Sequence, residues 1–464
     1  MMTKEGMFQQ KVEDAKTLFK DRKVKICTVG LGRIGLPTAA MFASSGATVI
    51  GVDINPEVVV NVNEGRCRFV DEPGLDKIIE EPVRQGKLRA TTDFSSAISQ
   101  ADFIIVCVPT PVDHTKTPDY SAVTAACGTI GKLLRAGSVV IIESTVGPGT
   151  VENLIRPILE SESGMRAGSD FGLASCPERS DPGNIITNMK TVPRVIGAIN
   201  QHCLDIVADL YETLLNIKVY KVADPKTANA VKLTENLFRD VNIALANEFA
   251  LVFERLGIDA LEVIKACATK YNFMPHYPGV GVGGPCLPSN SYYLISEGVK
   301  AGHIPSLVRM AREINDRMPD HVVSLVSEAL NEVGKTIRGS KIAILGVAYK
   351  PEIKDVQLTP MEPVCNNLSR LGGLLDIYDP MFAGESVFGY QTRRSLAQAV
   401  NGADCIIIGT AHREFLQLDL KLLVQLAESP AALVDARNIV NPKEALAAGF
   451  SFRGVGRRLS ANSV

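Results

Sequence analysis

A cysteine set among glycines and prolines is the residue of this sequence with the clearest potential for chemistry. The stretch GVGVGGPCLPSN, residues 279–290, holds four glycines, two prolines and Cys286. Glycines let a backbone come close to a bound molecule, and prolines fix the turn that presents a side chain. A buried structural cysteine needs only an apolar pocket. The stretch therefore predicts a binding loop and makes the Cys286 thiol a candidate for chemistry.

Three polar side chains upstream form a second candidate group. Lys232 and Asn236 are four residues apart and Arg239 follows three residues later, so a helix places them on one face. Lysine and asparagine side chains can stabilise a developing alkoxide as preorganised donors. A solvated polar stripe on a helix has the same spacing and remains the competing interpretation.

These three residues belong to a segment that is expected to form one long helix. Asp224 can cap it, Pro225 fits its first position, no Gly or Pro interrupts residues 226–256, and Gly257 suits its end. The expected helix is about 32 residues, or roughly 48 Å, long. Asp259 and Glu262 resemble a capping box for the next helix. So long a helix predicts a connection between domains or a subunit interface.

Residues 24–53 have the pattern of a dinucleotide-binding unit. VKICTVG and TVIGVD are strand-like, Gly30, Gly32 and Gly35 form G-x-G-x-x-G between them, and the second strand ends in Asp53. The glycines follow a strand and open a helix, and an acid lies about 20 residues downstream, which is the context that the fingerprint requires. Asp53 can hold the ribose hydroxyls and repels a 2′-phosphate. The pattern therefore predicts NAD as the cofactor.

Two more strands, within residues 101–111 and 138–150, end in turn residues where a parallel sheet binds ligands at its carboxyl edge. The hydroxyl side chains of Thr110, Ser144 and Thr145 are thus placed to face a cofactor, but they could equally serve only as ordinary turn and capping residues. The expected cofactor site comprises Gly30, Gly32, Arg33, Ile34, Gly35, Asp53, Pro109, Thr110, Ser144 and Thr145.

The C-terminal part repeats this pattern. The segments 341–350, 374–380, 403–410 and 431–438 correspond in order and character to the first four strands, without G-x-G-x-x-G after the first. We therefore expect an α/β protein with two Rossmann-like, doubly wound parallel-sheet domains joined by a long central helix and a helical domain. The expected boundaries are 1–220 for the NAD-binding domain, 221–330 for the helical domain and 331–464 for the second α/β domain.

Charge and cysteine distribution narrow the class of partner. The chain has 464 residues, with 49 Lys and Arg against 51 Asp and Glu. This balance argues against nucleic acid or an anionic membrane as partner and favours a small molecule. The ten cysteines are scattered, without CxxC pairs or Cys/His clusters, which predicts free thiols in a reducing cytoplasm and no metal site. We expect neither a signal peptide nor a membrane-spanning segment.

Ordered motifs give the chain a resemblance to a known family. They are STVGPG (144–149), CPERSDPGN (176–184), KLTENLFRDVNIALANEF (232–249), GVGVGGPCLP (279–288), and the lysine and arginine motifs AYKPEIKD (348–355) and VDARNIV (434–440). From about residue 24 to about residue 440 the chain resembles the nucleotide-sugar 6-dehydrogenases. It resembles the UDP-N-acetylmannosamine and UDP-N-acetylglucosamine enzymes more than the UDP-glucose enzymes, with a weak preference for the manno epimer.

The resemblance implies a four-electron oxidation of a sugar C6 alcohol to a carboxylate, with two NAD used in succession. Cys286 matches the nucleophile, Lys232 and Asn236 match the oxyanion-stabilising pair, and Thr145 and Glu178 match positions that hold water and act as acid or base. The substrate-binding positions that it implies are Glu178, Arg179, Lys232, Asn236, Arg239, Tyr277, Gly279, Gly283, Lys350 and Arg437. A homodimer through the long helix and a product used in surface polysaccharide or glycan synthesis are further implications.

Elementary chemistry is consistent with a cysteine in this reaction. A thiolate adds to the aldehyde formed first, and the thiohemiacetal can lose a second hydride to become a thioester. Cys286 precedes a helix expected to begin near Ser289, and the positive charge of Lys232 also favours a thiolate. A covalent bond to sulfur retains the aldehyde between the two oxidations.

Three positions depart from the family pattern. Asn290 stands where an aspartate is usual; it can cap a helix equally well but cannot act as a base. Thioester hydrolysis is therefore expected to depend on Glu178, with water held by Thr145. Pro285 stands where a histidine is common, and Gln357 stands where an arginine often lies near the cofactor. These changes indicate an altered substrate or rate, or partial chemistry.

Alternatives remain at this point. A two-electron dehydrogenase of the 3-hydroxyacid or 6-phosphogluconate type also carries a Lys-x-x-x-Asn pair, but it lacks the second α/β unit and Cys286. UDP-glucose is an alternative substrate. A regulator that senses NAD without turnover is a further alternative, motivated by Asn290 and Gln357.

Overall fold

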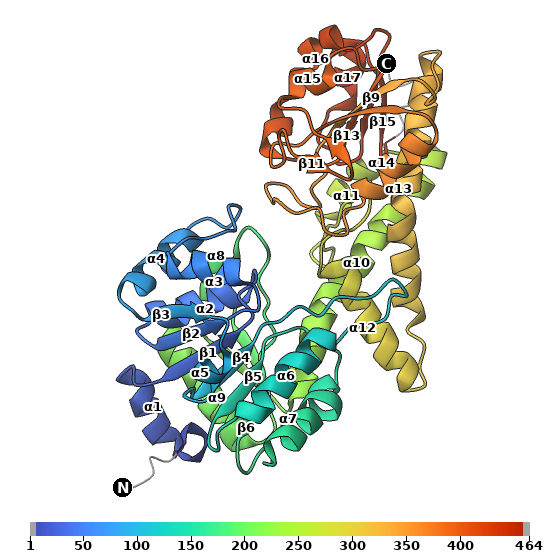
Figure 1. Ribbon diagram of the computed structural model, residues 1–464. Coiled ribbons are helices and arrows are strands. Elements are labelled where there is room, and N and C mark those ends of the chain that lie inside the picture. The colour runs from blue at the N-terminus through green and yellow to red at the C-terminus, as the bar shows by residue number, and fades with distance from the viewer. Residues whose placement is uncertain (1–5, 458–464) are drawn as a thin grey trace. The chain divides into compact units, whose positions relative to one another are not determined.

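The structure is a computed structural model that describes residues 6–457 and divides into two compact units (Figure 1). The first unit comprises the described residues up to Glu235 together with Tyr292–His303, and the second comprises Asn236–Ser291 and the described residues from Ile304 onward. The segment 221–330, predicted as a separate helical domain, therefore contributes residues to both units. The predicted boundaries themselves stay a prediction.

An eight-stranded sheet forms the centre of the first unit. Its strand order is β3-β2-β1-β4-β5-β6-β7-β8, and all neighbours are parallel except β6 and β7, which are antiparallel. The strands are β1 Lys25–Val29, β2 Thr48–Val52, β3 Leu88–Thr91, β4 Phe103–Val106, β5 Val139–Ile142, β6 Gly172–Ser175, β7 Arg194–Ala198 and β8 Val219–Val222. The reversal of strand order at β1 and β4 creates the edge where doubly wound sheets bind ligands.

Helices cover both faces of this sheet, because successive strand side chains point to opposite sides and both sets are apolar. Ile26 and Ile105 pack in the core beneath one layer of helices, whereas Cys27 and Ile104 pack in the core on the other side. The first layer contains α1 Val12–Lys20, α2 Gly35–Ser44, α3 Pro56–Asn63, α4 Leu75–Arg84 and α9 Gln201–Leu215; the second contains α5 Phe94–Ile98, α6 Ser121–Leu133 and α7 Arg156–Ser163. Three shorter elements are the 3-10 helix Met7–Gln9, the π-helix Val151–Ile155 and α8 Ile185–Thr191.

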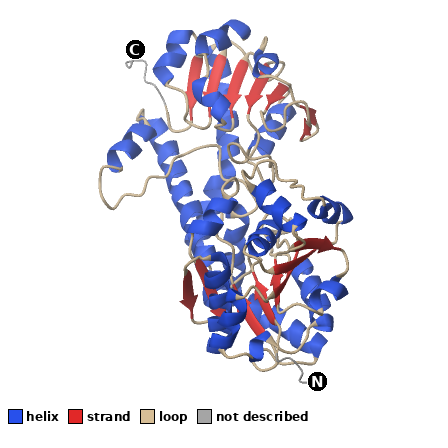
Figure 2. Cartoon of the chain, turned by 90° about the vertical axis from the view of Figure 1, so that its left-hand side faces the viewer, coloured by secondary structure: helices blue, strands red, loops and turns tan. Residues whose placement is uncertain are grey.

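The second unit contains a five-stranded, all-parallel sheet of order β10-β9-β13-β14-β15. Its strands are β9 Lys341–Leu345, β10 Leu374–Tyr378, β13 Cys405–Ile408, β14 Ala432–Asp435 and β15 Ser451–Gly454; β11 Ser386–Val387 and β12 Tyr390–Gln391 form a separate hairpin. One face packs against α13 Ser306–Glu332 and α14 Met361–Arg370, and the other against α15 Leu396–Val400, α16 Leu420–Leu426 and α17 Pro442–Ala448. Figure 2 shows both sheets with their flanking helices. The prediction of two Rossmann-like sheets is confirmed.

The long helix is confirmed at both ends. α10 runs from Pro225 to Leu256 and has 32 residues. The Asp224 carboxylate accepts a hydrogen bond from the backbone N–H of Thr227 at 2.7 Å, and Gly257 has a φ of 71°, the left-handed conformation that ends helices. α11 follows as Ala260–Cys267, with Asp259 as its N-cap.

No helix within residues 6–457 combines the length and the apolar character needed to cross a bilayer.

Candidate active site

The glycine turn after β1 has the geometry that a dinucleotide requires. Gly30 has a φ of 89°, and a Cβ atom there would lie 2.8 Å from the carbonyl oxygen of Cys107. A Cβ on Gly35 would lie 1.8 Å from the carbonyl oxygen of Gly30, so only glycine lets α2 start so close to the strand. A Cβ on Gly32 would meet no atom within 4 Å. The turn is thus closed toward the protein and open at Gly32, where the fingerprint places the pyrophosphate.

Asp53 directly follows β2, as predicted. Its Oδ2 accepts the backbone N–H of Leu31 at 2.8 Å, and its Oδ1 accepts the N–H of Asn55 at 2.9 Å. These bonds hold the carboxylate against the glycine turn, where it can bind ribose hydroxyls. Ile34 is the residue before the first turn of α2.

The structure gives Arg33 a partner that the sequence did not reveal. Its guanidinium forms two hydrogen bonds with Asp71, at 2.9 and 2.8 Å, and lies 3.6 Å from Glu72. It also lies over the ring of Phe69, 5.0 Å from the centroid. Glu72 in turn accepts the N–H of Gly183 at 2.8 Å. Arg33 therefore ties the glycine turn to other loops, and a contact with cofactor stays a prediction.

Turn residues after β4 and β5 come together, because these neighbouring parallel strands end at one edge of the sheet. Thr110 Oγ1 donates to the carbonyl of Thr145 at 2.7 Å. Ser144 Oγ donates to the carbonyl of Val108 at 2.7 Å and is buried. Pro109 is exposed beside them. The hydroxyls of Thr110 and Ser144 thus stabilise the turns, and whether they also contact cofactor stays a prediction.

Glu178 follows β6 at the same edge and is buried, with 7% of its surface exposed. Its Oε1 accepts the N–H groups of Arg179 at 2.8 Å and Ser180 at 2.7 Å, and its Oε2 pairs with Arg194. Arg179 pairs with Glu235 through Nε at 3.0 Å. Both predicted residues are thus present in a buried, hydrogen-bonded cluster. Arg194, which sequence analysis missed, supplies the positive charge beside Glu178.

The polar stripe predicted on α10 is solvated only at its end. Lys232 is 7% exposed, and two other polar residues of the same helix, Asp240 and Asn247, are fully buried. Asn236 is partly buried and Arg239 is exposed. A buried lysine carries a cost that surface lysines do not, and such positions are functional candidates. The competing interpretation of a solvated stripe therefore fails for Lys232 and holds only for Arg239.

Cys286 lies immediately before α12, which runs from Leu287 to Lys300. Its carbonyl accepts the first helical hydrogen bond, from the N–H of Asn290 at 2.9 Å. The helix therefore begins two residues earlier than the predicted start at Ser289. Cys286 is the one exposed cysteine of the ten, and all ten are free thiols within residues 6–457. The N-terminus of a 14-residue helix next to this sulfur favours the thiolate.

Buried cysteines behave differently. Burial raises the pKa of Cys27, Cys127, Cys203 and Cys365 to about 12. These thiols stay protonated and inert at neutral pH. Exposure and a helix N-terminus therefore distinguish Cys286 from them.

The expectation that Asn290 caps a helix is wrong. Asn290 lies inside the first turn of α12, and its carboxamide oxygen accepts a hydrogen bond from Nδ2 of Asn236 at 2.6 Å. The pair fixes which way the Asn236 amide faces. An aspartate at position 290 would accept the same bond as a charged acceptor, so asparagine keeps the contact and removes the charge.

A buried polar network holds the binding loop to two helices, and sequence analysis missed it. The Gly279 N–H donates to Oδ1 of Asn247 at 2.9 Å, and Nδ2 of Asn247 donates to Asn315 at 2.9 Å. Asn315 and Arg312 of α13 both donate to Asp240, at 2.9 and 2.7 Å. Burial raises the pKa of Asp240 and the charge of Arg312 opposes that effect. A sequence signal existed, because residues 236, 240 and 247 share one helix face.

The Cys286 loop packs against the lysine motif. The Gly284 N–H donates to the carbonyl of Gln357 at 3.0 Å. A Cβ on Gly283 would lie 2.8 Å from the carbonyl oxygen of Leu358 and 2.9 Å from Tyr349. Lys350 follows Tyr349 directly. The structure therefore brings the cysteine loop and the segment of Lys350 together within the second unit, as the shared site would require.

The arginine motif reaches the same loop. A Cβ on Gly279 would lie 3.3 Å from Nη1 of Arg437, and Nδ2 of Asn438 donates to the carbonyl of Pro278 at 3.1 Å. Within residues 6–457, Nε of Arg437 is buried without a hydrogen-bond partner. Such a donor in a native protein requires an acceptor from solvent or ligand. Tyr277, two residues before Gly279, is half exposed.

Asp379 and its partner His412 stabilise the turn of the lysine motif. Asp379 follows β10 as Asp53 follows β2, and its Oδ2 accepts the N–H groups of Val347 at 2.7 Å and Ala348 at 3.0 Å. His412 is fully buried; its Nε2 lies 3.1 Å from the same oxygen, and its Nδ1 accepts the N–H of Glu352 at 3.1 Å. His412 therefore holds the turn that carries Lys350.

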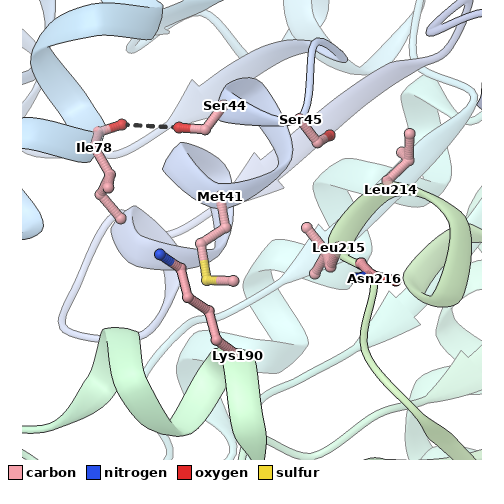
Figure 3. Close-up of a pocket in the computed structure, with 8 residues that line it drawn as sticks. All are labelled: Met41, Ser44, Ser45, Ile78, Lys190, Leu214, Leu215 and Asn216. Atoms are coloured by element: carbon pink, nitrogen blue, oxygen red, sulfur yellow. Dashed lines mark hydrogen bonds between the residues drawn. The ribbon is translucent and has the colours of Figure 1, made fainter.

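A shallow hollow of about 340 Å³ lies elsewhere in the first unit (Figure 3). Its lining residues are Met41, Ser44, Ser45, Ile78, Lys190, Leu214, Leu215 and Asn216. Met41 and Ser44 belong to the C-terminal half of α2, whereas the glycine turn opens its N-terminus. The hollow is therefore not the cofactor site. Between residues 6 and 457 no group of three or more His, Cys, Asp or Glu side chains is placed to hold a metal ion.

Comparison with known proteins matches three domains of one family. Residues 24–215 match the NAD binding domain of the UDP-glucose/GDP-mannose dehydrogenase family, residues 226–317 match its central domain, and residues 343–442 match its UDP binding domain.

Individual relatives agree over nearly the whole length. A UDP-N-acetyl-D-mannosamine dehydrogenase of Pyrococcus horikoshii is 38% identical, over 94% of this chain and 99% of the relative. A UDP-N-acetyl-D-glucosamine 6-dehydrogenase of Pseudomonas aeruginosa is 32% identical, over 90% of this chain and 98% of the relative. A solved structure of a UDP-D-ManNAc dehydrogenase from Pyrococcus horikoshii matches with a TM-score of 0.86 at 37% identity, covering 95% of this chain and all of that one.

Proposed function

This chain belongs to the UDP-glucose/GDP-mannose dehydrogenase family, and we propose that it oxidises the C6 alcohol of a UDP-N-acetylhexosamine to the carboxylate. UDP-N-acetylmannosamine is the favoured substrate and UDP-N-acetylglucosamine the next. The names of the relatives from Pyrococcus horikoshii and Pseudomonas aeruginosa support this choice. The overall reaction consumes one water and two NAD⁺ per sugar and releases two NADH and three protons.

The chain is an NAD-dependent oxidoreductase, and the first unit holds the cofactor. Gly30, Gly32 and Gly35 fit the pyrophosphate, and Asp53 fits the adenosine ribose. The cofactor supplies the hydride acceptor for each of the two oxidations. An acid at position 53 favours NAD over a cofactor with a 2′-phosphate.

In the proposed mechanism, Lys232 and Asn236 donate hydrogen bonds to the sugar C6 oxygen as negative charge develops on it. One such preorganised donor is worth on the order of 3 kcal/mol in comparable sites. Cys286 adds to the aldehyde as a thiolate, and the bond between sulfur and carbon keeps this intermediate on the protein until it becomes a thioester. The burial of Lys232 and the helix N-terminus at Cys286 support these roles.

Hydrolysis then ends the reaction. Water held by Thr145 adds to the acyl carbon, its proton passes to Glu178, and the bond between carbon and the sulfur of Cys286 breaks. Asn290 cannot accept that proton, because a carboxamide is not a base.

One observation carries the proposal more than any other. Within the second unit, the loop that ends in Cys286 contacts both the segment of Lys350 and the side chain of Arg437, whose Nε is buried and unsatisfied within residues 6–457. A nucleophile on a loop that also contacts cationic segments fits the oxidation of a sugar phosphate ester, since phosphates pair with cations and the sugar must reach the thiol.

Counting NADH per sugar tests the proposal. A panel of UDP-sugars is incubated with excess NAD, and we expect two NADH and one carboxylate per UDP-N-acetylhexosamine consumed. One NADH per sugar would support the two-electron alternative, and no turnover with any UDP-sugar would support the NAD-sensing regulator. Cys286→Ala should yield no carboxylate. Cys267→Ala, a partly exposed cysteine outside the site, should keep the wild-type stoichiometry.

A homodimer through α10 is part of this proposal. Five apolar side chains of the helix are exposed at spacings of seven, four, three and four residues: Phe238, Leu245, Phe249, Val252 and Leu256. This spacing places them on one face, and an apolar stripe of this kind on a helix is typical of an interface. A second copy of the chain would cover the stripe.

A cytoplasmic location and a role for the product in polysaccharide or glycan synthesis complete the proposal. Ten free cysteines support a reducing compartment. A protein named CapL of Staphylococcus aureus is 32% identical over 90% of this chain.

A further inference from the structure

A buried ion pair joins Glu178 to strand β7. Arg194 begins this strand and is 2% exposed. Its Nη1 pairs with Oε2 of Glu178. Because both side chains are removed from water, this pair is screened little, and the guanidinium strongly favours the ionised carboxylate.

The two oxygens of Glu178 have different surroundings. Oε1 accepts hydrogen bonds from the N–H of Arg179, the N–H of Ser180 and the Ser180 hydroxyl. Oε2 accepts from Arg194. A carboxylate oxygen has about two lone-pair positions, so Oε1 is saturated and Oε2 keeps one. The carboxylate is therefore fixed in orientation, with a single position from which it can take a proton.

Arg194 is itself held in place by a buried polar cluster that includes residues of α9 and α2. Its guanidinium lies 5.5 Å from the ring centroid of Tyr211. The Tyr211 hydroxyl donates to Glu143 at 2.6 Å, and Thr38 of α2 donates to the other oxygen of Glu143 at 3.0 Å. Burial by itself would lower the pKa of Arg194. The negative charge of Glu143, together with neighbouring groups, outweighs the effect of burial, so the pKa is raised. The guanidinium thus stays charged.

Glu178 is the direct partner of this charge. Within residues 6–457, Nε and Nη2 of Arg194 have no hydrogen-bond partner, so Nη1 makes the guanidinium's hydrogen bond to a carboxylate. A structural arginine in a protein core usually spreads its donors over several acceptors, because unpaired donors are costly. The hydrogen bond of the guanidinium is therefore directed at Glu178, while its charge also interacts with Glu143.

We propose that Arg194 is a positioning residue for thioester hydrolysis: it keeps Glu178 ionised and oriented so that Oε2 can accept the proton of the attacking water. This inference rests on the proposed function. It also explains how the reaction proceeds with Asn290, because the base is supplied by a glutamate that a buried cation keeps deprotonated.

The step balances without a further reactant. The water oxygen bonds to the acyl carbon, one water proton moves to Oε2 of Glu178, and the electron pair of the breaking carbon–sulfur bond leaves with the Cys286 sulfur as thiolate. The product acid ionises and Glu178 returns its proton to solvent. Arg194 keeps its own proton throughout, since its role is to stabilise charge.

Single-turnover decay of the acyl-enzyme as a function of pH tests the proposal. The enzyme is mixed with UDP-N-acetylhexosamine and excess NAD, quenched at intervals, and the thioester at Cys286 is counted by intact mass. Arg194→Met should move the acid limb of the decay rate upward by about 1 to 3 pH units and make the acyl-enzyme accumulate. Arg135→Met removes a half-exposed arginine paired with Asp102 in the same unit and should behave as wild type.

A double variant separates positioning from a merely structural role. If Arg194 acts through Glu178, then Arg194→Met adds nothing to Glu178→Gln, and the double variant should hydrolyse the thioester within about threefold of Glu178→Gln alone. A larger loss overturns the proposal. An unshifted acid limb in Arg194→Met also overturns it, because a structural effect would lower the rate equally at every pH.

Loss of the buried cation could prevent Arg194→Met from folding, since Glu178 would be left as an unpaired buried charge. Arg194→Lys keeps the charge and should keep the acid limb within about half a pH unit of wild type; a shift as large as a full unit overturns the inference. Failure of the proposed function gives a different result from failure of this inference, because the wild type would then form no NADH with any UDP-sugar. In that case, a double-mutant cycle of Arg194→Met and Glu178→Gln on the free energy of unfolding in urea measures the coupling of the two residues.

Discussion

Asn247→Ala should loosen the binding loop by an amount that follows from its two hydrogen bonds. Asn247 is fully buried; its Oδ1 accepts the Gly279 N–H at 2.9 Å, and its Nδ2 donates to Asn315 at 2.9 Å. Alanine removes both bonds and leaves a buried donor and a buried acceptor unpaired. Each unpaired group costs about 1–3 kcal/mol, and relaxation around the smaller side chain recovers part of that. The expected loss is about 2–4 kcal/mol.

Hydrogen exchange measures this loss where it arises. A free-energy change of about 2 kcal/mol corresponds to roughly a 30-fold change in the opening equilibrium. The amides of residues 279–284 should therefore exchange at least about 30-fold faster in Asn247→Ala, while amides of the β1 and β4 strands stay unchanged. Because Gly279 lies beside Arg437, the KM for the UDP-sugar should rise more than kcat falls.

A matched control lies on the same helix. The side chain of Asn242 donates to the carbonyl of Phe238 at the surface of α10, and water replaces such a bond. Asn242→Ala should therefore cost less than about 0.5 kcal/mol. The reasoning is refuted if Asn247→Ala leaves both the exchange of residues 279–284 and the KM at wild-type values, because the network would then not restrain the loop.

Three further outcomes follow from other parts of the structure. Asp53→Asn removes the charge that repels a 2′-phosphate, so the ratio of kcat/KM for NADP to that for NAD should rise about tenfold or more; an unchanged ratio contradicts the placement of the ribose. Burial raises the pKa of Asp379, but the hydrogen bonds that its carboxylate accepts from His412 and from the N–H groups of Ala348 and Val347 outweigh burial, and the pKa is lowered on balance. The stabilisation is therefore complete above the ordinary value of about 4 and is lost as pH falls below it, so urea unfolding should show the advantage of wild type over Asp379→Asn nearly constant from about pH 6 to pH 5 and clearly smaller at about pH 3. A constant advantage over that range would show that ionisation of Asp379 does not contribute. If the chain forms the proposed homodimer through α10, Val252→Glu should be monomeric in sedimentation where the wild type is dimeric, whereas Leu371→Glu, at an exposed apolar position elsewhere, should stay dimeric; a dimeric Val252→Glu protein would place the interface elsewhere.

The parts of the fold that depend on local pattern could be predicted from the sequence. Apolar runs ending in turn residues predicted β1, β2, β4 and β5 and their counterparts in the second sheet, because a strand buried on both faces must be apolar throughout. The long helix was predicted at both ends, since Asp224, Pro225 and Gly257 act through local backbone chemistry. The start of α12 was placed two residues late, because Cys286 and Leu287 carry no capping signal.

Partners distant in sequence were decided only by the tertiary structure. Arg33 matched the cofactor fingerprint by position, yet it pairs with Asp71, because a loop 38 residues away supplies a carboxylate. Asn290 was expected to cap a helix, but its oxygen accepts from Asn236, 54 residues away. No spacing rule connects such pairs.

The sequence by itself determined the two sheets, the glycine turn, the acid at position 53 and the glycine-rich loop of Cys286, because each depends on neighbours within a few residues. Only the tertiary structure decided which polar groups would be buried together, among them Arg194 with Glu178 and Asn247 with Gly279. The physical reason is that an unpaired buried charge or amide is costly, so its partner is set by whatever segment the packed core brings within hydrogen-bonding distance.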